Sequence, residues 1–276
     1  MAVAESAFEK ESFAKKVQEE KRQFYAVVSS NLARMAANPD LFMAYLNVQS
    51  HMPQYSVGNC MMLAIQCPSA CNVKLATTWT EHGVKPLKGT RGIAIMVPTK
   101  KYTKKDGTIA QGYDLRRVFD VMQTTAGEDY IKQGPPRIQK RKVLRALMEY
   151  QQGAWQFHSV SEGEAAKYTI ESQTITIRTH QAFETLFPAL LKEVTCADLV
   201  LGKNMSTDNA YLLSICVSYM LCHKYRIPTP NLILPSPTQI MGDNPEQYVV
   251  RLNQLVKTYR TMLHVIESAG QKEGIT

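Results

Sequence analysis

The pattern of hydrophobic and polar positions predicts helices in the first quarter of the chain. Apolar residues recur at roughly helical spacing from Glu11 to about Met35, which indicates an amphipathic helix. The tripeptide "NPD" at 38–40 predicts the end of this helix and the beginning of a second one, which continues through "LFMAYLNVQSHM". We expect a third helix to begin near Ser56 and to end at Pro68, because proline does not continue a helix.

Short runs rich in β-forming residues follow these helices. "KLATTW" and "GIAIMVP" predict two strands, and the polar tip "KKYTKKDGT" leads to a third, "YDLRRVFDV". The first domain is therefore expected to combine helices with a small, mostly antiparallel sheet. Further on, Gly-Pro-Pro at 134–136 breaks the chain, and a basic helix follows it.

The second half of the chain predicts a second α+β unit. "KYTIESQTITIRTH" (167–180) alternates like a β-hairpin, and "AFETLFPALLKEVTCADLVLG" has helical periodicity up to Gly202. "NAYLLSICVSYMLCHKYRI" predicts another helix, and a Pro-rich extended connection leads to a final helix with a continuous apolar stripe. We expect an α+β protein with a first domain at 1–125, a basic linker at 126–152 and a second domain at 153–276.

The composition excludes several classes of protein. A chain of 276 residues with 45% hydrophobic and 20% charged residues is long enough for two folded domains and is not of the disordered type. Because no apolar run approaches the roughly 18 to 20 residues that cross a bilayer, we expect a cytoplasmic protein without a membrane partner. The six cysteines fit reduced thiols, and the Cys67-x3-Cys71 pair has no second pair that would make it a metal site. No phosphate-cradling glycine loop is found, and we expect no cofactor.

Charge is distributed unevenly along the chain. The formal net charge is +8, and residues 85–145 carry fifteen Lys or Arg against five Asp or Glu, a net of +10. A one-sided basic surface is typical of nucleic-acid binding, because neutralised phosphates release condensed counterions. The same charge is compatible with a solvated surface or with an acidic protein partner.

Cations and aromatic residues alternate in the most basic part. A sequence-tolerant binder of single strands needs cations along the backbone and flat rings for base stacking. The candidate nucleic-acid-binding residues are Trp79, Lys85, Lys88, Arg91, Lys100, Lys101, Tyr102, Lys104, Lys105, Tyr113, Arg116 and Arg117. Burial in the core is an equal alternative for Trp79, and the lysines can instead protect an edge strand from aggregation.

An ordered series of anchors between residues 12 and 125 resembles the N-terminal domain of ArdC-type antirestriction proteins. The anchors are Tyr55-Ser56, Asn59, Gln66-x-Pro68, Trp79-x3-Gly83, Lys88-Gly89-x2-Gly92-Ile93, Pro98 and "VFDVMQT" at 118–124. Proteins of this family occur on plasmids, conjugative elements and phages. The resemblance implies a single-stranded DNA-binding module, with antirestriction or protection of transferred DNA as the role and a host defence or transfer protein as a further partner.

The helix "LLKEVTCADL" looks like a zincin helix without its histidines. In H-E-x-x-H two imidazoles on one helical face hold zinc, and the glutamate acts on the metal-bound water. Here Lys192, Glu193 and Cys196 stand at these three positions. The ArdC resemblance extends, more weakly, to about residue 230 and implies a zincin-like α+β domain of the ImmA/IrrE type.

Three readings of this degenerate motif remain. Because a lysine ammonium repels a divalent ion, we expect no bound metal and a catalytically silent pseudo-metallopeptidase, with Lys192 at the vacated metal position and paired with Glu193 or Asp208. Cys196, with Glu193, Asp208 or His223, could instead form a non-standard zinc metallopeptidase site. A third alternative is a protein-interaction or inhibitor module that uses its basic face.

Overall fold

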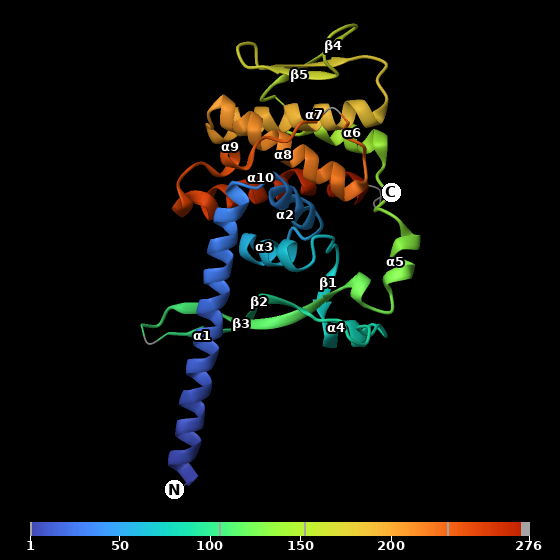
Figure 1. Ribbon diagram of the computed structural model, residues 1–276. Helices are drawn as coiled ribbons and strands as arrows, with labels where there is room; N and C mark the ends of the chain where they lie inside the picture. The colour runs from blue at the N-terminus through green and yellow to red at the C-terminus, as the bar shows by residue number, and fades with distance from the viewer. Residues whose placement is uncertain (1, 105, 152, 231, 272–276) are drawn as a thin grey trace. The chain divides into compact units, whose positions relative to one another are not determined.

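The structure is a computed structural model that describes residues 2–104, 106–151, 153–230 and 232–271. The chain forms two compact units, the first from residues 1–48 and 58–133 and the second from residues 49–57 and 134–276. Figure 1 shows the order of their elements. Within the described ranges, no helix is both long and apolar enough to cross a membrane.

Three helices open the first unit, as the sequence predicts. They are α1 (Ala2–Ala36), α2 (Pro39–His51) and α3 (Val57–Gln66). On α1, Phe24, Val28 and Leu32 are buried at helical spacing, while Val27 stays 43% exposed. The last residues of α2 already belong to the second unit.

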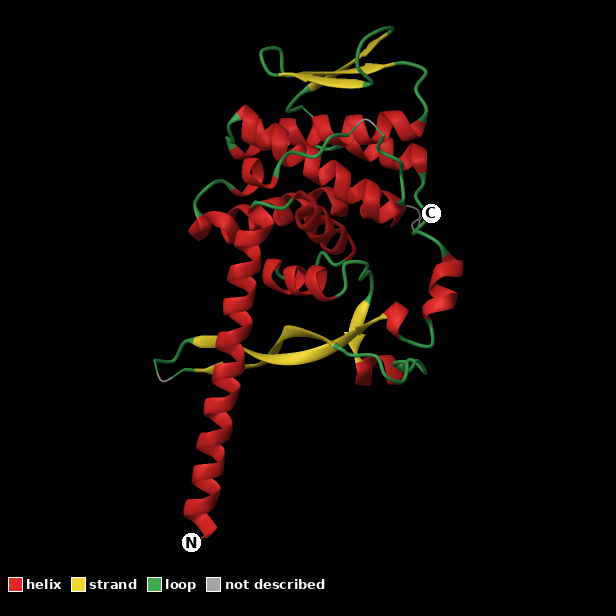
Figure 2. Cartoon of the chain, in the orientation of Figure 1, coloured by secondary structure: helices red, strands yellow, loops and turns green. Residues whose placement is uncertain are grey.

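The first unit carries a three-stranded antiparallel sheet with strand order β1-β3-β2. Its strands are β1 (Val73–Leu75), β2 (Ile93–Thr103) and β3 (Ile109–Asp120). β2 and β3 form a long ribbon, with a register shift between Pro98 and Lys101 (Figure 2). In contrast to the expected strand "KLATTW", only its first residues are extended, and Ala76–Glu81 form helix α4 because this conformation buries Trp79.

Side chains of α3 close the outer edge of β2. The Asn59 side chain donates to the Met96 carbonyl (2.7 Å) and accepts from the Met96 N–H (2.9 Å). Gln66, seven residues further along α3, makes the same two contacts with Ala94 at 3.3 and 3.2 Å. Each amide thus imitates a neighbouring strand, which satisfies an edge that otherwise invites aggregation.

A short 3-10 helix, η1 (Val121–Gln123), and helix α5 (Gly127–Gln133) complete the first unit. Asp120, fully buried, fixes this end of the sheet. Its Oδ2 accepts from the N–H groups of Cys71 (2.8 Å) and Asn72 (2.9 Å), and its Oδ1 accepts from Met122 N–H (3.0 Å). Both carboxylate oxygens therefore hold backbone groups rather than facing solvent.

The second unit combines a three-stranded sheet with packed helices. Its strand order is β4-β6-β5, with β4 (Gln156–Val160), β5 (Ala166–Thr169) and β6 (Thr174–Arg178). The β5–β6 hairpin confirms the prediction, whereas β4, which runs parallel to β6, was not expected because its residues lack a buried alternation. The helices are α6 (Lys140–Glu149), α7 (Phe183–Ala197), η2 (Asp198–Gly202), α8 (Thr207–Tyr225), α9 (Pro237–Met241), η3 (Pro245–Gln247) and α10 (Tyr248–Gln271).

Two expectations about the second half need correction. Residues 126–152 are not a free linker, because α6 buries Val143 and Leu147 and packs against α7 and α10. The Pro-rich connection is not extended throughout, since Ser236 begins helix α9 with a capping box. The predicted stripe on α10 is confirmed, with Leu252, Tyr259 and Met262 fully buried.

Candidate functional site

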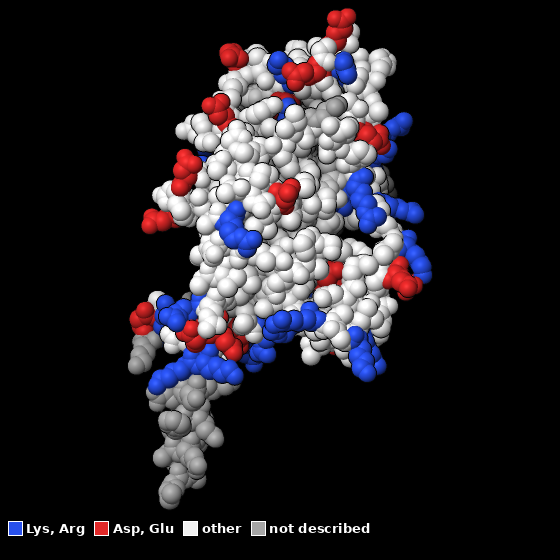
Figure 3. Space-filling view, viewed as in Figure 1, with Lys and Arg blue, Asp and Glu red and all other residues white. Residues whose placement is uncertain are grey.

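The basic side chains of the first unit lie on its surface. Of the twelve candidate nucleic-acid-binding residues, Lys105 lies outside the described residues, Trp79 is buried, and the other ten are exposed. Figure 3 shows Lys and Arg side chains gathered around the sheet of this unit, with a few acidic ones among them. The charge excess of the sequence is therefore available to an anionic partner.

Trp79 does not belong to this surface. It is 4% exposed, and its Nε1 donates to the Phe119 carbonyl at 2.8 Å. The Lys74 ammonium lies over its ring, 4.7 Å from the ring centre. A base therefore has no free face on which to stack, and we correct the assignment of Trp79 from nucleic-acid binding to core packing.

The two exposed tyrosines lie on opposite faces of the β2–β3 ribbon. Tyr113 pairs with Pro98, and Tyr102 pairs with Ala110, so the two pairs occupy alternate faces. Lys101, which pairs with Gln111, and Arg117 share the face of Tyr113. We call Lys101, Tyr113 and Arg117 the Tyr113 face; its three side chains are exposed.

Acidic neighbours moderate the charge on the other face. Asp114 lies 3.5 Å from Arg116 and 3.4 Å from Lys21 of α1, which crosses this part of the ribbon. Arg117, by contrast, donates to the Gly92 carbonyl at 2.8 Å, a contact that leaves its positive charge uncompensated. The Tyr113 face thus combines free positive charge with an exposed ring.

In the second unit, Lys192 and Glu193 form a largely buried ion pair. Lys192 Nζ lies 2.8 Å from Glu193 Oε1, and the two side chains are 17% and 7% exposed. The other oxygen, Oε2, accepts from the Tyr168 N–H of β5 at 2.9 Å. The Lys192 ammonium also lies 4.9 Å from the centre of the Tyr211 ring on α8. The predicted pairing of Lys192 with Glu193 is confirmed, and sequence patterns gave no signal for the roles of Tyr168 and Tyr211.

The surroundings keep Lys192 charged and Cys196 neutral. Burial lowers the pKa of Lys192, but the hydrogen bond and the charge of Glu193 outweigh it, so the pKa is raised above its ordinary value. Burial, followed by the charge of Glu193, raises the pKa of the Cys196 thiol to about 11. At neutral pH this position therefore holds an ammonium, an engaged carboxylate and a protonated thiol.

These residues do not fit a divalent metal ion. Both Glu193 oxygens are engaged, and Cys196 is not the thiolate that binds zinc. His223 is twelve residues beyond Tyr211 on α8, about 18 Å along the helix axis, and cannot join the group. Among the described residues, no cluster of three or more His, Cys, Asp or Glu could hold a metal.

An open cleft of about 510 Å³ lies beside the ion pair. Lys192 and Tyr211 line it, together with Pro188, Ile215 and Leu232. Its charged lining residues are Lys192 and Arg178 with Glu164 and Glu184. The cleft is thus mainly apolar, with the Lys192 ammonium on its wall.

Comparison with known proteins identifies the fold. No family model and no curated protein matches the sequence. Two crystal structures of the antirestriction ArdC protein from plasmid R388, one metal-free and one Mn(II)-bound, match with TM-scores of 0.58 and 0.56. Each is 14% identical, and the matches cover 87% of this chain and 98% and 97% of theirs. The resemblance that the sequence anchors predict is therefore confirmed at the level of structure, and this chain is ArdC-like in fold.

Proposed function

We propose that the first unit binds single-stranded DNA with little sequence preference. The observation that carries the proposal is the exposed Tyr113 face, where Lys101 and Arg117 flank an accessible ring. Cations that follow the phosphates and a ring that stacks on any base are the two requirements of such binding. The ArdC-like fold is compatible with a DNA partner, and the similar structures are of an antirestriction protein from plasmid R388.

The biological role that we infer is antirestriction or protection of transferred DNA by a mobile element. A protein that covers incoming single strands would act while the DNA is vulnerable to host enzymes. A host defence or transfer protein is a further partner within this proposal, since exposed cations also attract acidic protein surfaces.

We further propose that the second unit is a zincin-like scaffold without metallopeptidase activity. The Lys192–Glu193 pair at 2.8 Å supports this, because it occupies the carboxylate that would act on a metal-bound water. The relative from plasmid R388 has a Mn(II)-bound structure. This chain would differ by holding a fixed ammonium at the corresponding motif, and it would bind DNA unchanged after treatment with a chelator.

Fluorescence anisotropy with labelled single-stranded and duplex oligonucleotides tests the first proposal. Tyr113→Leu should weaken binding of the single strand by roughly 5- to 150-fold, the equivalent of the ~1–3 kcal/mol of one base stacked on an aromatic ring. Tyr102→Leu is the matched control, since it removes another exposed tyrosine from the opposite face of the same ribbon. Equal effects of the two substitutions would contradict the assignment of the face.

The outcome also separates the competing functions. A preference for duplex, or absence of binding at low salt, would contradict single-strand binding and favour an acidic protein partner. A metallopeptidase would instead show metal-dependent peptide cleavage that is lost on Glu193→Gln.

A further inference from the structure

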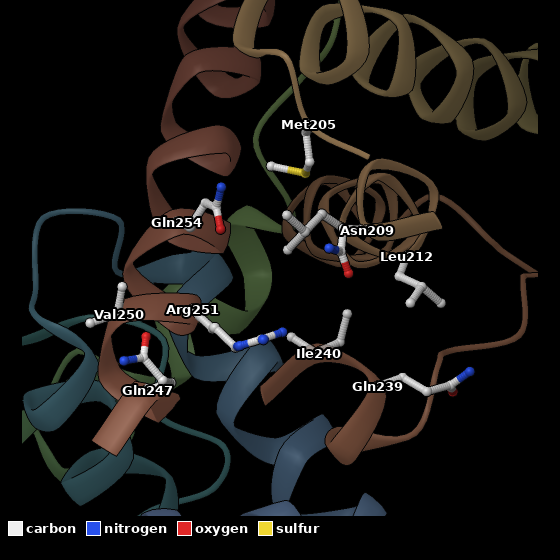
Figure 4. Close-up of a pocket in the computed structure, with 10 residues that line it drawn as sticks. Met205, Asn209, Leu212, Gln239, Ile240, Gln247, Val250, Arg251 and Gln254 are labelled. Atoms are coloured by element: carbon white, nitrogen blue, oxygen red, sulfur yellow. The ribbon is translucent and has the colours of Figure 1, made fainter. Parts of the chain in front are cut away.

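A polar pocket of about 250 Å³ lies in the second unit between α8, α9 and α10. Figure 4 shows Arg251 extending from α10 toward Ile240 of α9, and Asn209 of α8 also lines this pocket. Gln254, one turn further along α10, and Gln247 also line the pocket. Among the described residues that line it, none is Asp or Glu. The wall therefore offers one cation and several amide donors without a carboxylate.

Among the described residues, Arg251 has no counter-ion. Its side chain is partly buried, and within the described part of the chain we find no hydrogen bond or ion pair of its guanidinium. A guanidinium has five N–H donors, and no described protein acceptor holds those of Arg251, so they are available to a ligand in the pocket. Arg251 is therefore a solvent-accessible cation in the pocket that the described residues leave unpaired.

The backbone keeps the guanidinium in place. Gly242, at the end of α9, has a φ of +75°, and a Cβ at this position would lie 3.1 Å from Arg251 Cζ. A side chain here would be disfavoured by the backbone and would displace the guanidinium. The glycine thus leaves the space that Arg251 occupies in the pocket.

The arrangement of donors selects the chemistry of the ligand. A guanidinium pairs with planar carboxylates and with phosphates. Asn209 comes from a different helix than Arg251 and Gln254, so the donors approach from more than one side, which suits a tetrahedral anion better than a planar one. A volume below the ~300 Å³ of typical ligand pockets limits the ligand to a small molecule or to the end of a larger one.

We propose that this pocket binds a phosphate group, with Arg251 as the cation and Asn209 and Gln254 as amide donors. Inorganic phosphate, a nucleoside monophosphate and the 5′-phosphate of an oligonucleotide share this chemistry. The proposal is independent of DNA binding by the first unit, because all its residues belong to the second.

Calorimetric titration of the full chain with inorganic phosphate and with deoxyadenosine monophosphate tests the proposal. Arg251→Gln should lower the affinity for both ligands at least tenfold, without lowering the thermal stability of the ligand-free protein, since no partner is lost. Lys257→Gln is the matched control: it removes an exposed charge from α10 outside the pocket and should leave the affinity unchanged. Should Arg251→Gln fold poorly, Asn209→Leu, at an exposed position, provides the second variant.

Thermal unfolding provides an independent readout. At ten times Kd, phosphate should raise the Tm of the wild-type protein by roughly 3 to 6 °C beyond its effect on Arg251→Gln. The Tm shifts of wild type and Arg251→Gln are compared because phosphate also stabilises proteins non-specifically. Tighter binding of the monophosphate, or of 5′-phosphorylated over unphosphorylated oligonucleotide, would identify the source of the phosphate. Equal binding by wild type and Arg251→Gln, or no binding by wild type, would overturn the proposal.

Discussion

Removal of the Lys192 ammonium should destabilise the second unit. In Lys192→Met, Glu193 keeps its hydrogen bond from Tyr168 but loses the cation at 2.8 Å, while remaining buried. Breaking a buried ion pair on one side typically costs 3–5 kcal/mol. Because Lys192 is 17% exposed and Glu193 retains one partner, we expect the lower end of this range, about 3 kcal/mol at neutral pH.

The double variant separates the ion pair from packing. Lys192→Met combined with Glu193→Gln removes both charges and retains an acceptor for the Tyr168 N–H. We therefore expect a coupling energy of about 1.5 to 3 kcal/mol between the two substitutions. Lys167→Met is the control, because its pair with Glu164 is 61% and 58% exposed and should contribute at most ~1 kcal/mol.

The two tryptophans make the assay specific for each unit. Trp79 is in the first unit and Trp155 in the second, and both are buried. Urea unfolding in a Trp79→Phe background, followed by fluorescence of Trp155, reports on the second unit alone. A loss for Lys192→Met no larger than that for Lys167→Met, or a coupling energy near zero, would refute the reasoning.

Two further predictions concern pH and the sheet edge. Burial, followed by the charge of neighbouring His223 and of Lys224 and Arg226, lowers the pKa of His51 to about 4, and burial also lowers that of His223. Because the unfolded chain takes up these protons first, the second unit should lose up to about 3 kcal/mol of stability as pH falls from 6.5 to 4. His51→Gln should reduce the pH dependence of the urea midpoint measured by Trp155 fluorescence. An unchanged pH dependence would contradict protonation of His51 as its cause. In the first unit, Asn59→Ala should lower the free energy of unfolding by about 2 kcal/mol, because it leaves both Met96 backbone groups unpaired. Urea unfolding followed by Trp79 fluorescence in a Trp155→Phe background measures this loss. A loss below ~0.5 kcal/mol would contradict the role of Asn59.

Periodicity and anchor residues predicted most of the fold for identifiable reasons. Long amphipathic patterns such as that of α10 specify a helix because one face must be buried. The anchors Asn59, Gln66, Trp79 and Asp120 are informative because each makes contacts that hold backbone groups of distant segments. They encode the architecture of the first unit, and none of these four contacts faces an external ligand.

Other features were beyond sequence patterns because they depend on tertiary contacts. β4 joins its sheet through pairing with β6 and has no buried alternation of its own. "KLATTW" contains strong β-formers, yet residues 76–81 form a helix, because the helical conformation buries the Trp79 side chain in the core. The partners of the Lys192–Glu193 pair come from β5 and α8, and Arg251 and Asn209 line one pocket from two different helices. No local sequence spacing therefore predicts either group.

The salt dependence of single-strand binding tests the central claim most directly. On single strands, each cation that neutralises a phosphate contributes about 0.7 to the slope of log K against log salt. Joint Lys101→Ala and Arg117→Ala, which removes both cations of the Tyr113 face, should therefore reduce the slope by about 1.4. Lys167→Ala with Lys257→Ala, which removes two exposed cations from the second unit, should leave the slope unchanged. Equal slopes for the two variants would contradict a phosphate-binding surface on the β2–β3 ribbon.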